Sequence, residues 1–322
     1  GLGTFVWERS SLLGQNGRLL TLGKWVDGIP EDMSRDRPII LSLKGFIALV
    51  EGNPENGLPL LIKAMESFRA AGDIPNLALS LVRIAWAHRL LGDYAASLVV
   101  CDEAMKLTMD TDTLHSLHAE AQRSKGLNLF RLGQAGQALD WLEGSLAYYR
   151  SIQKKRHASM VEAEMGMAYR AIGEYESARK CYENALATLR QIGDLTWQAT
   201  LLNSMGVLYH AEGQYEKSVS SFEQGLDCAR RSGYLDTEAL ILASMGDLYA
   251  EIGDLAIARQ TYAQANKIAH TVFDQFLINY LTMVEADLAR QEGDMERVSA
   301  LLDAVQPAVK SSGSSYEQGI FF

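Results

Sequence analysis

Hydrophobic and polar positions alternate with helical periodicity along this chain, and the whole pattern repeats about every 40 residues. A glycine followed by a polar residue marks each repeat, at Gly52, Gly92, Gly133, Gly173, Gly213, Gly253 and Gly293. The steps between these glycines are 40, 41, 40, 40, 40 and 40 residues. A fixed period of this length is typical of a solenoid, in which stacked supersecondary units share one continuous core.

Each repeat predicts two helices joined by a turn at this glycine. A small residue stands seven positions before each turn glycine, at Gly45, Ala85, Gly126, Gly166, Gly206, Gly246 and Ala286. A larger apolar residue stands nine positions after it in most repeats, at Leu61, Leu142, Tyr182, Phe222 and Tyr262. Small residues let two helices cross closely while bulky ones fill the remaining gaps. We therefore expect Gly166, Gly206 and Gly246 at helix crossings, and the turn glycines in the left-handed conformation that ends a helix.

Further punctuation falls half a period later, at Gly72, Gly193 and Gly233. Proline is absent from residues 76–306, as long uninterrupted helices require. No alternating, turn-bounded pattern typical of strands is present. The sequence therefore predicts an all-α protein.

Two segments carry a family resemblance. Residues 165–169 (MGMAY) and 205–209 (MGVLY), with Gly173 and Gly213 after them, resemble the tetratricopeptide repeat (TPR). The unit here has 40 residues instead of the usual 34. The resemblance implies a right-handed superhelical solenoid of about seven 40-residue helix-turn-helix (TPR-like) repeats, which we place at residues 38–313.

The two ends predict additional elements. Residues 1–37 are expected to form an N-terminal helical hairpin before the solenoid, and residues 314–322 to begin a further, truncated repeat. Residues 22–30 (LGKWVDGIP) and 37–41 (RPIIL) resemble the segment leading into the repeats of large ATP-dependent LuxR-like transcription regulators of the maltose-activator type. In that family an ATPase region precedes the repeats and a helix-turn-helix DNA-binding domain usually follows them.

Composition excludes several classes of partner. The formal net charge of −10 argues against direct nucleic-acid binding, which needs clustered Lys and Arg. No apolar run approaches the length that spans a bilayer. Three cysteines without close spacing, Cys101, Cys181 and Cys228, favour a reducing cytoplasm, and we expect Cys101 and Cys181 to be small buried hydrophobes.

No motif for catalysis, nucleotide binding or a cofactor is present, so the sequence predicts a protein that is not an enzyme. His115 and His118 are three residues apart, but no third or fourth metal ligand accompanies them. We expect these histidines to lie at a solvated helix start, with no metal site.

The resemblance implies that the first helices of the repeats line a concave groove. By this correspondence the candidate residues for a ligand or partner in the groove are Arg83, Trp86, Arg89, Arg123, Phe130, Arg131, Met167, Arg170, Asn203 and His210. Arginine forks beside aromatic surfaces suit a protein or peptide segment, or a small polar effector. The alternative is that these side chains are simply solvated.

Two functions remain open on the sequence alone. One is a ligand-sensing and interaction module of a bacterial transcription regulator, which could self-associate in the full-length protein. The other is a stand-alone TPR scaffold or peptide-binding adaptor.

Overall fold

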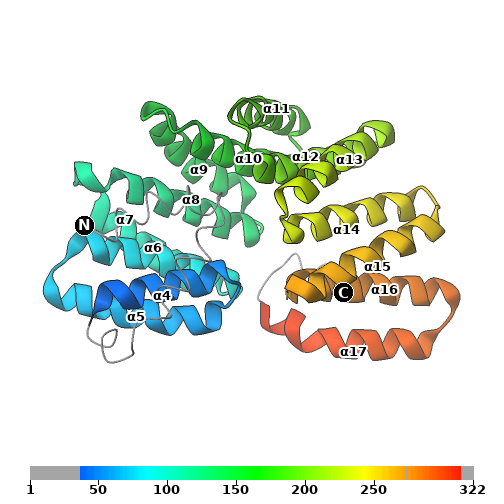
Figure 1. The fold of residues 1–322 in the computed structure, drawn as a ribbon, viewed down its shortest axis with the longest axis horizontal. Helices are drawn as coiled ribbons and strands as arrows, with labels where there is room; N and C mark the ends of the chain where they lie inside the picture. Colours follow the sequence, from blue (N-terminus) through cyan, green and yellow to red (C-terminus); the bar gives the residue numbers. More distant parts are fainter. Residues whose placement is uncertain (1–36, 273–274, 313–322) are drawn as a thin grey trace. The chain divides into compact units, whose positions relative to one another are not determined.

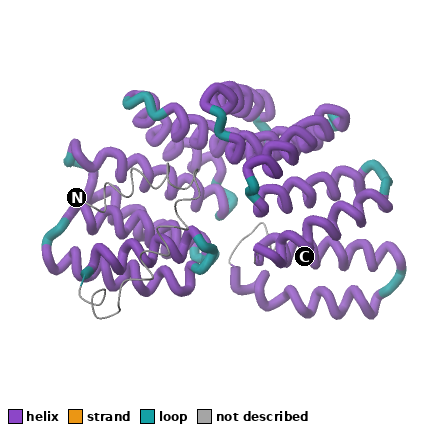
Figure 2. The backbone as a smooth tube through the Cα atoms, in the orientation of Figure 1, coloured by secondary structure: helices purple, strands orange, loops and turns teal. Residues whose placement is uncertain are grey.

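A computed structural model describes residues 37–272 and 275–312, and within these ranges every regular element is a helix (Figures 1 and 2). The α-helices form seven consecutive pairs, which confirms the predicted helical repeat solenoid. The first helices of the pairs are α4 (Pro38–Val50), α6 (Ile74–Leu90), α8 (His115–Arg131), α10 (Lys155–Ala171), α12 (Leu195–Ala211), α14 (Leu235–Glu251) and α16 (Gln275–Glu292). The second helices are α5 (Pro54–Ala71), α7 (Tyr94–Thr108), α9 (Ala135–Ser151), α11 (Tyr175–Ile192), α13 (Tyr215–Ser232), α15 (Leu255–Val272) and α17 (Met295–Ser312). A short 3-10 helix, η1 (Asp112–Leu114), precedes α8.

The chain divides into two compact units, residues 1–129 (unit 1) and 130–322 (unit 2). The expected N-terminal hairpin and the expected truncated repeat at residues 314–322 lie outside the described residues, Arg37 excepted. No helix in the described ranges has both the length and the apolar character to cross a membrane.

The turn glycines end the first helices as predicted. All seven have positive φ, from 70° at Gly213 to 87° at Gly253. At Gly213 the backbone N–H donates to the carbonyl of His210 at 2.9 Å, and the next N–H donates to Tyr209 at 2.8 Å. Glycine suits these positions because it has no Cβ to clash in the left-handed region. At one half-period turn Gln153 adopts this conformation instead, with φ 56°.

The crossing glycines permit close contact between the two helices of a repeat. A Cβ at Gly206 would lie 2.4 Å from Cε1 of Phe222, and one at Gly166 would lie 2.3 Å from Cε1 of Tyr182. Gly246 and Tyr262 repeat this contact at 2.4 Å. These distances confirm that the three glycines sit at crossings, each under the large side chain of the partner helix.

The first helices of unit 2 form a continuous layer. Helix α12 contacts α10 on one side and α14 on the other, in addition to packing on its own second helix. The second helices of successive repeats do not approach one another to the same degree among the described residues. Closer spacing on one side of a helical array curves the array toward that side. The surface made by α10, α12 and α14, which we call the first-helix surface, is therefore the concave side of unit 2.

Candidate functional site

Arg170 lies on the first-helix surface near the end of α10. The hydroxyl of the buried Tyr182 on α11 lies near Arg170 and near Ser204 of α12. Burial raises the pKa of Tyr182 to about 12, and the nearby Arg170 guanidinium offsets part of that rise. The Tyr182 hydroxyl thus lies near polar groups of α10 and α12 but makes no hydrogen bond within the described residues.

His210 continues this polar row from α12 to α14. Its Nε2 lies 2.8 Å from Oε2 of Glu251, and the Tyr215 hydroxyl donates to Oε1 of the same carboxylate at 3.0 Å. The His210 side chain is only 17% exposed, whereas that of Glu251 is 55% exposed. The pair therefore joins two repeats while its acidic member still faces solvent.

Asp247 extends the row from α14 to α16. Its Oδ1 accepts hydrogen bonds from the hydroxyls of Tyr262 at 2.8 Å and Tyr280 at 2.6 Å. Burial raises the pKa of Asp247, while the two phenols and then His210 act in the opposite direction. The row is thus basic at α10 and acidic at α14.

Asn203 is the least exposed of the predicted groove residues in unit 2, at 7%. Its Oδ1 has no hydrogen-bond partner among the described residues. Buried polar atoms are nearly always paired, so an unpaired acceptor needs a reason. Val207 and His210 follow one and two turns later on α12, and Met167 of α10 packs against the core beside them.

Two further predicted residues end α8. Arg131 is exposed, and its guanidinium lies 5.9 Å from the ring centre of Phe276 on α16. Phe130 is half-buried.

The remaining predicted residues belong to unit 1. Arg83 is 2% exposed, because it donates to the carbonyl and hydroxyl of Ser42 at 3.1 and 2.8 Å and covers the ring of Phe46. Trp86 also contacts Phe46, with ring centres 6.0 Å apart, and Arg123 donates to Glu120 at 3.0 Å. Arg89 lies half-buried near Cys101. The ten predicted residues therefore form two sets, four in unit 1 and six in unit 2, and Arg83 is too buried to meet a ligand.

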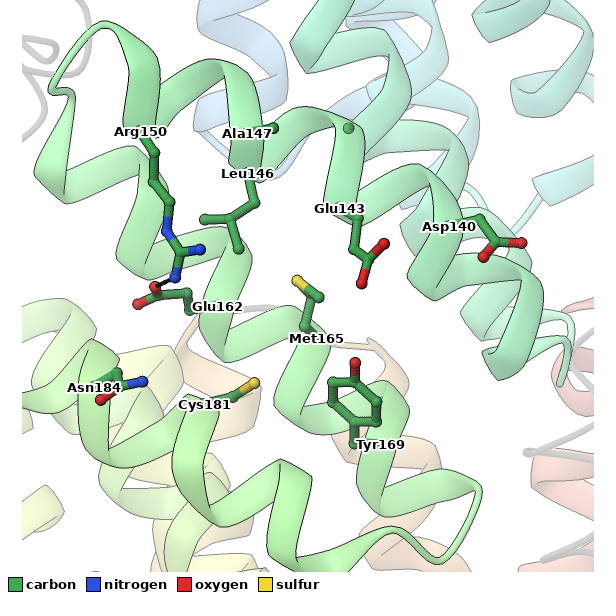
Figure 3. A pocket seen from close by; sticks show the side chains of 11 residues that line it. Asp140, Glu143, Leu146, Ala147, Arg150, Glu162, Met165, Tyr169, Cys181 and Asn184 are labelled. Carbon is green, nitrogen blue, oxygen red and sulfur yellow. Dashed lines mark hydrogen bonds and ion pairs between the residues drawn. The ribbon is translucent and has the colours of Figure 1, made fainter.

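A cleft that the sequence did not reveal lies among the helices α9, α10 and α11 of unit 2 (Figure 3). It has a volume of about 610 Å³ and runs between the second helices α9 and α11, with the first helix α10 as its floor. We call it the second-helix cleft. It is lined by Asp140, Glu143, Gly144, Leu146, Ala147, Arg150, Glu162, Met165, Tyr169, Cys181 and Asn184.

Cys101 and Cys181 differ in their exposure, and His118 lies next to a hydroxyl group. Cys101 is buried as expected, but the same expectation was wrong for Cys181, which is half-buried at the cleft because Tyr182 occupies the crossing position. Burial raises the pKa of Cys101 to about 12 and of Cys181 to about 11, so both thiols are protonated at neutral pH. No cluster of three metal-ligating side chains occurs in the described ranges, and His118 lies 3.1 Å from the Thr108 hydroxyl.

A family model for the tetratricopeptide repeat matches residues 158–231 and 197–269. No curated protein sequence gives a significant match.

Several solved structures share the fold at low identity. A Rap protein complexed with Competence and Sporulation Factor is 14% identical over 92% of this chain and 80% of its own, with a TM-score of 0.71. Aspartyl phosphate phosphatase F from Bacillus subtilis is 10% identical over 86% and 71%, with a TM-score of 0.67. The Rap conjugation gene regulator of plasmid pLS20, in complex with the Phr* peptide, is 14% identical over 88% and 79%, with a TM-score of 0.64. The chain thus carries tetratricopeptide repeats, confirmed by the family model over residues 158–269, in a helical solenoid fold shared with these solved structures.

Proposed function

We propose that this chain is a non-catalytic interaction module that binds a peptide or protein segment on the first-helix surface of unit 2. The observation that carries the proposal is the arrangement of Arg170, Asn203 and His210 on the adjacent first helices α10 and α12. The side-chain oxygen Oδ1 of Asn203 is buried and has no hydrogen-bond partner among the described residues. A segment lying across α10 and α12 would meet Arg170 and His210 and pass over the Asn203 carboxamide between them.

The three side chains supply complementary chemistry for such a segment. An extended chain exposes unpaired backbone N–H and C=O groups, and a carboxamide can pair with both kinds. Arg170 offers a fork for a carboxylate or a C-terminus. Val207 and Met167 provide apolar contact between these polar groups. Phe130 and Arg131, the last two residues of α8, also belong to unit 2, and we include them in the proposed surface.

Two of the similar structures favour this class of ligand. They are Rap proteins in complex with Competence and Sporulation Factor and with the Phr* peptide. At 14% identity the likeness concerns the fold, so the residues that would hold a ligand here are those of this chain.

We further propose that the module senses its ligand within a bacterial transcription regulator in the cytoplasm. The support is the resemblance of residues 22–30 and 37–41 to the segment before the repeats of LuxR-like regulators. Ligand binding would favour one curvature of the solenoid and so alter self-association of the full-length protein. The full-length protein should then self-associate in a ligand- and ATP-dependent way. If it binds the ligand but has neither property, it is an adaptor.

The binding proposal is tested by selecting linear peptides from a random library on the purified chain. The affinity of an enriched peptide is then measured for Arg170→Ala and Asn203→Ala. Loss of one charged hydrogen bond costs about 1.5–3 kcal/mol, so Arg170→Ala should weaken binding about tenfold or more.

Arg231→Ala is the matched control. It removes the same charge from the second helix α13, where Arg231 is 61% exposed and pairs with Asp227 of its own helix. Affinity should be unchanged in this variant. Failure to enrich any peptide, or equal losses in Arg170→Ala and Arg231→Ala, would contradict the proposed surface.

A further inference from the structure

The second-helix cleft is separate from the surface proposed for peptides. Tyr169 of α10 lines the cleft, whereas the next residue, Arg170, lies near Tyr182 and Ser204. The two sites therefore use different faces of the same helix, because adjacent residues of an α-helix point in directions about 100° apart.

An arginine that bridges neighbouring second helices in two other repeats turns to a first helix beside the cleft, as Arg230 of α13 also does toward Glu238 of α14. Arg190 of α11 donates to Gln224 of α13 at 3.1 Å, and Arg69 of α5 pairs with Glu103 of α7 at 2.5 Å. Arg150 holds the same position in α9, seventeen residues after its turn glycine. It pairs instead with Glu162 of α10, 2.5 Å away (Figure 3). No such arginine bridge therefore joins α9 to α11.

Glu162 is a charged residue at a position that several other repeats fill with a buried leucine. Eleven residues before the turn glycine, four other repeats place the buried leucines Leu41, Leu81, Leu202 and Leu242, and the remaining two place the half-buried Gln122 and Thr282. Glu162 is only 8% exposed, so it puts a carboxylate where a leucine would complete the core. Residues that break a local rule of the fold are expected at functional sites.

Gly144 removes the side chain that would fill the opening. At the same position, eleven residues after the turn glycine, five of the other six repeats carry longer polar side chains, at Lys63, Glu103, Asn184, Gln224 and Gln264, and the last repeat has Ala304. The space above Gly144 in α9 is left to the cleft.

The lining is apolar at the floor and acidic at the rim. Met165 of α10 lies at the floor, Leu146 of α9 and the protonated thiol of Cys181 of α11 lie at the sides, and the Tyr169 ring faces the same space (Figure 3). On the α9 side, Asp140 and Glu143 are exposed, and no ion pair engages either carboxylate among the described residues. The lining thus carries three carboxylates and one guanidinium, that of Arg150, which pairs with Glu162.

We propose that the second-helix cleft binds a small organic cation, an ammonium or guanidinium group on an apolar stem. The stem lies on Met165, Leu146 and the Tyr169 ring, because these surfaces are apolar. The cation meets Glu143 and Asp140 at the rim, where it balances the excess negative charge. A volume of about 610 Å³ accommodates a molecule of this class and is small for a whole partner helix.

The test uses phenylbutylamine and its uncharged counterpart phenylbutanol on protein with isotope-labelled methionine methyl groups. The Met165 resonance, assigned with Met165→Leu, reports binding in the cleft. The amine should shift this resonance saturably and bind about fivefold more tightly than the alcohol, as expected for a partly solvated ion pair. Equal affinity for the two compounds would overturn the proposal of a cation site.

Three variants locate the effect. Gly144→Gln restores the side chain found at this position in the next repeats and should abolish the Met165 shift with the other methionine resonances unchanged. Glu143→Gln should remove most of the preference for the amine. Glu183→Gln, the corresponding carboxylate one repeat later, should leave that preference intact.

Other outcomes are equally decisive. A shift that persists in Gly144→Gln would mean that the amine binds elsewhere. If the Met165 resonance does not shift with the amine but shifts with a lysine-rich peptide, the cleft binds a protein segment and not small cations. Neither result depends on the first-helix surface, so this test and the peptide selection fail independently.

Discussion

The contact between Gly206 and Phe222 offers the sharpest test of how these repeats are held together. In Gly206→Ala the added Cβ would lie 2.4, 2.5 and 2.9 Å from three ring carbons of Phe222. Carbon atoms prefer separations of about 3.5–4.0 Å, so the ring or the helix must move by about 1 Å. Phe222 is fully buried, which leaves the ring no free space to enter.

The expected loss follows from two opposing effects. Overpacking a filled core costs about 1–3 kcal/mol. Alanine in place of glycine within a helix returns about 0.5–1 kcal/mol, because the unfolded chain loses freedom. We therefore expect Gly206→Ala to lower the free energy of unfolding by about 1 kcal/mol or more.

Gly136→Ala is the matched control. Gly136 lies in the first turn of α9, and nothing lies within 4 Å of the position its Cβ would occupy. This variant should keep or slightly raise the urea midpoint, followed by circular dichroism, while Gly206→Ala lowers it. Equal stability of Gly206→Ala and the parent would refute the proposed close crossing. A gain in both variants would show that helix propensity outweighs packing here.

Three more predictions follow from the same contacts. Burial raises the pKa of Asp247, so its ionised form is disfavoured in the folded state and its contribution to stability falls as pH rises through the folded pKa. The stability of Asp247→Asn relative to the parent should therefore increase from about pH 3 to about pH 7, and an opposite trend in paired urea titrations would contradict the assignment. Asp194→Ala removes the N-cap bond to Trp197 N–H at 3.1 Å and the 2.6 Å bond from Arg156, and should lower the free energy of unfolding by about 2 kcal/mol or more; a loss below about 0.5 kcal/mol would count against it. The fully buried Cys101 should resist a thiol reagent at neutral pH until urea unfolds the chain, and rapid labelling of Cys101 in the native protein would contradict its burial.

The repeat and its crossings could be predicted from sequence because both depend on local chemistry. A glycine at a helix end and a small residue at a crossing are needed wherever the unit recurs, so each of them repeats. Gly166, Gly206 and Gly246 were found in this way, together with the large side chains above them. The turn at Gln153 escaped the pattern because a non-glycine residue adopts the left-handed conformation there.

The side-chain sites were harder to predict because they depend on which neighbour a long side chain reaches. Arg83 has the spacing of a groove residue but turns inward to Ser42 and Phe46. Arg150 has the spacing of a bridge between second helices but turns to Glu162. A comparison of equivalent positions would have singled out Glu162, where four other repeats have leucine, and Gly144, where five other repeats have a longer polar residue. Neither of these two residues by itself predicts a cleft.

Photo-crosslinking tests the central claim, binding of a segment on the first-helix surface, most directly. A photoreactive phenylalanine derivative is placed at Val207 on α12 or at Gln224 on the exposed side of α13. A library-selected peptide should crosslink at Val207 and not at Gln224. Crosslinking at Gln224 alone, with both proteins folded and binding the peptide, would place the ligand on the second helices and contradict the account.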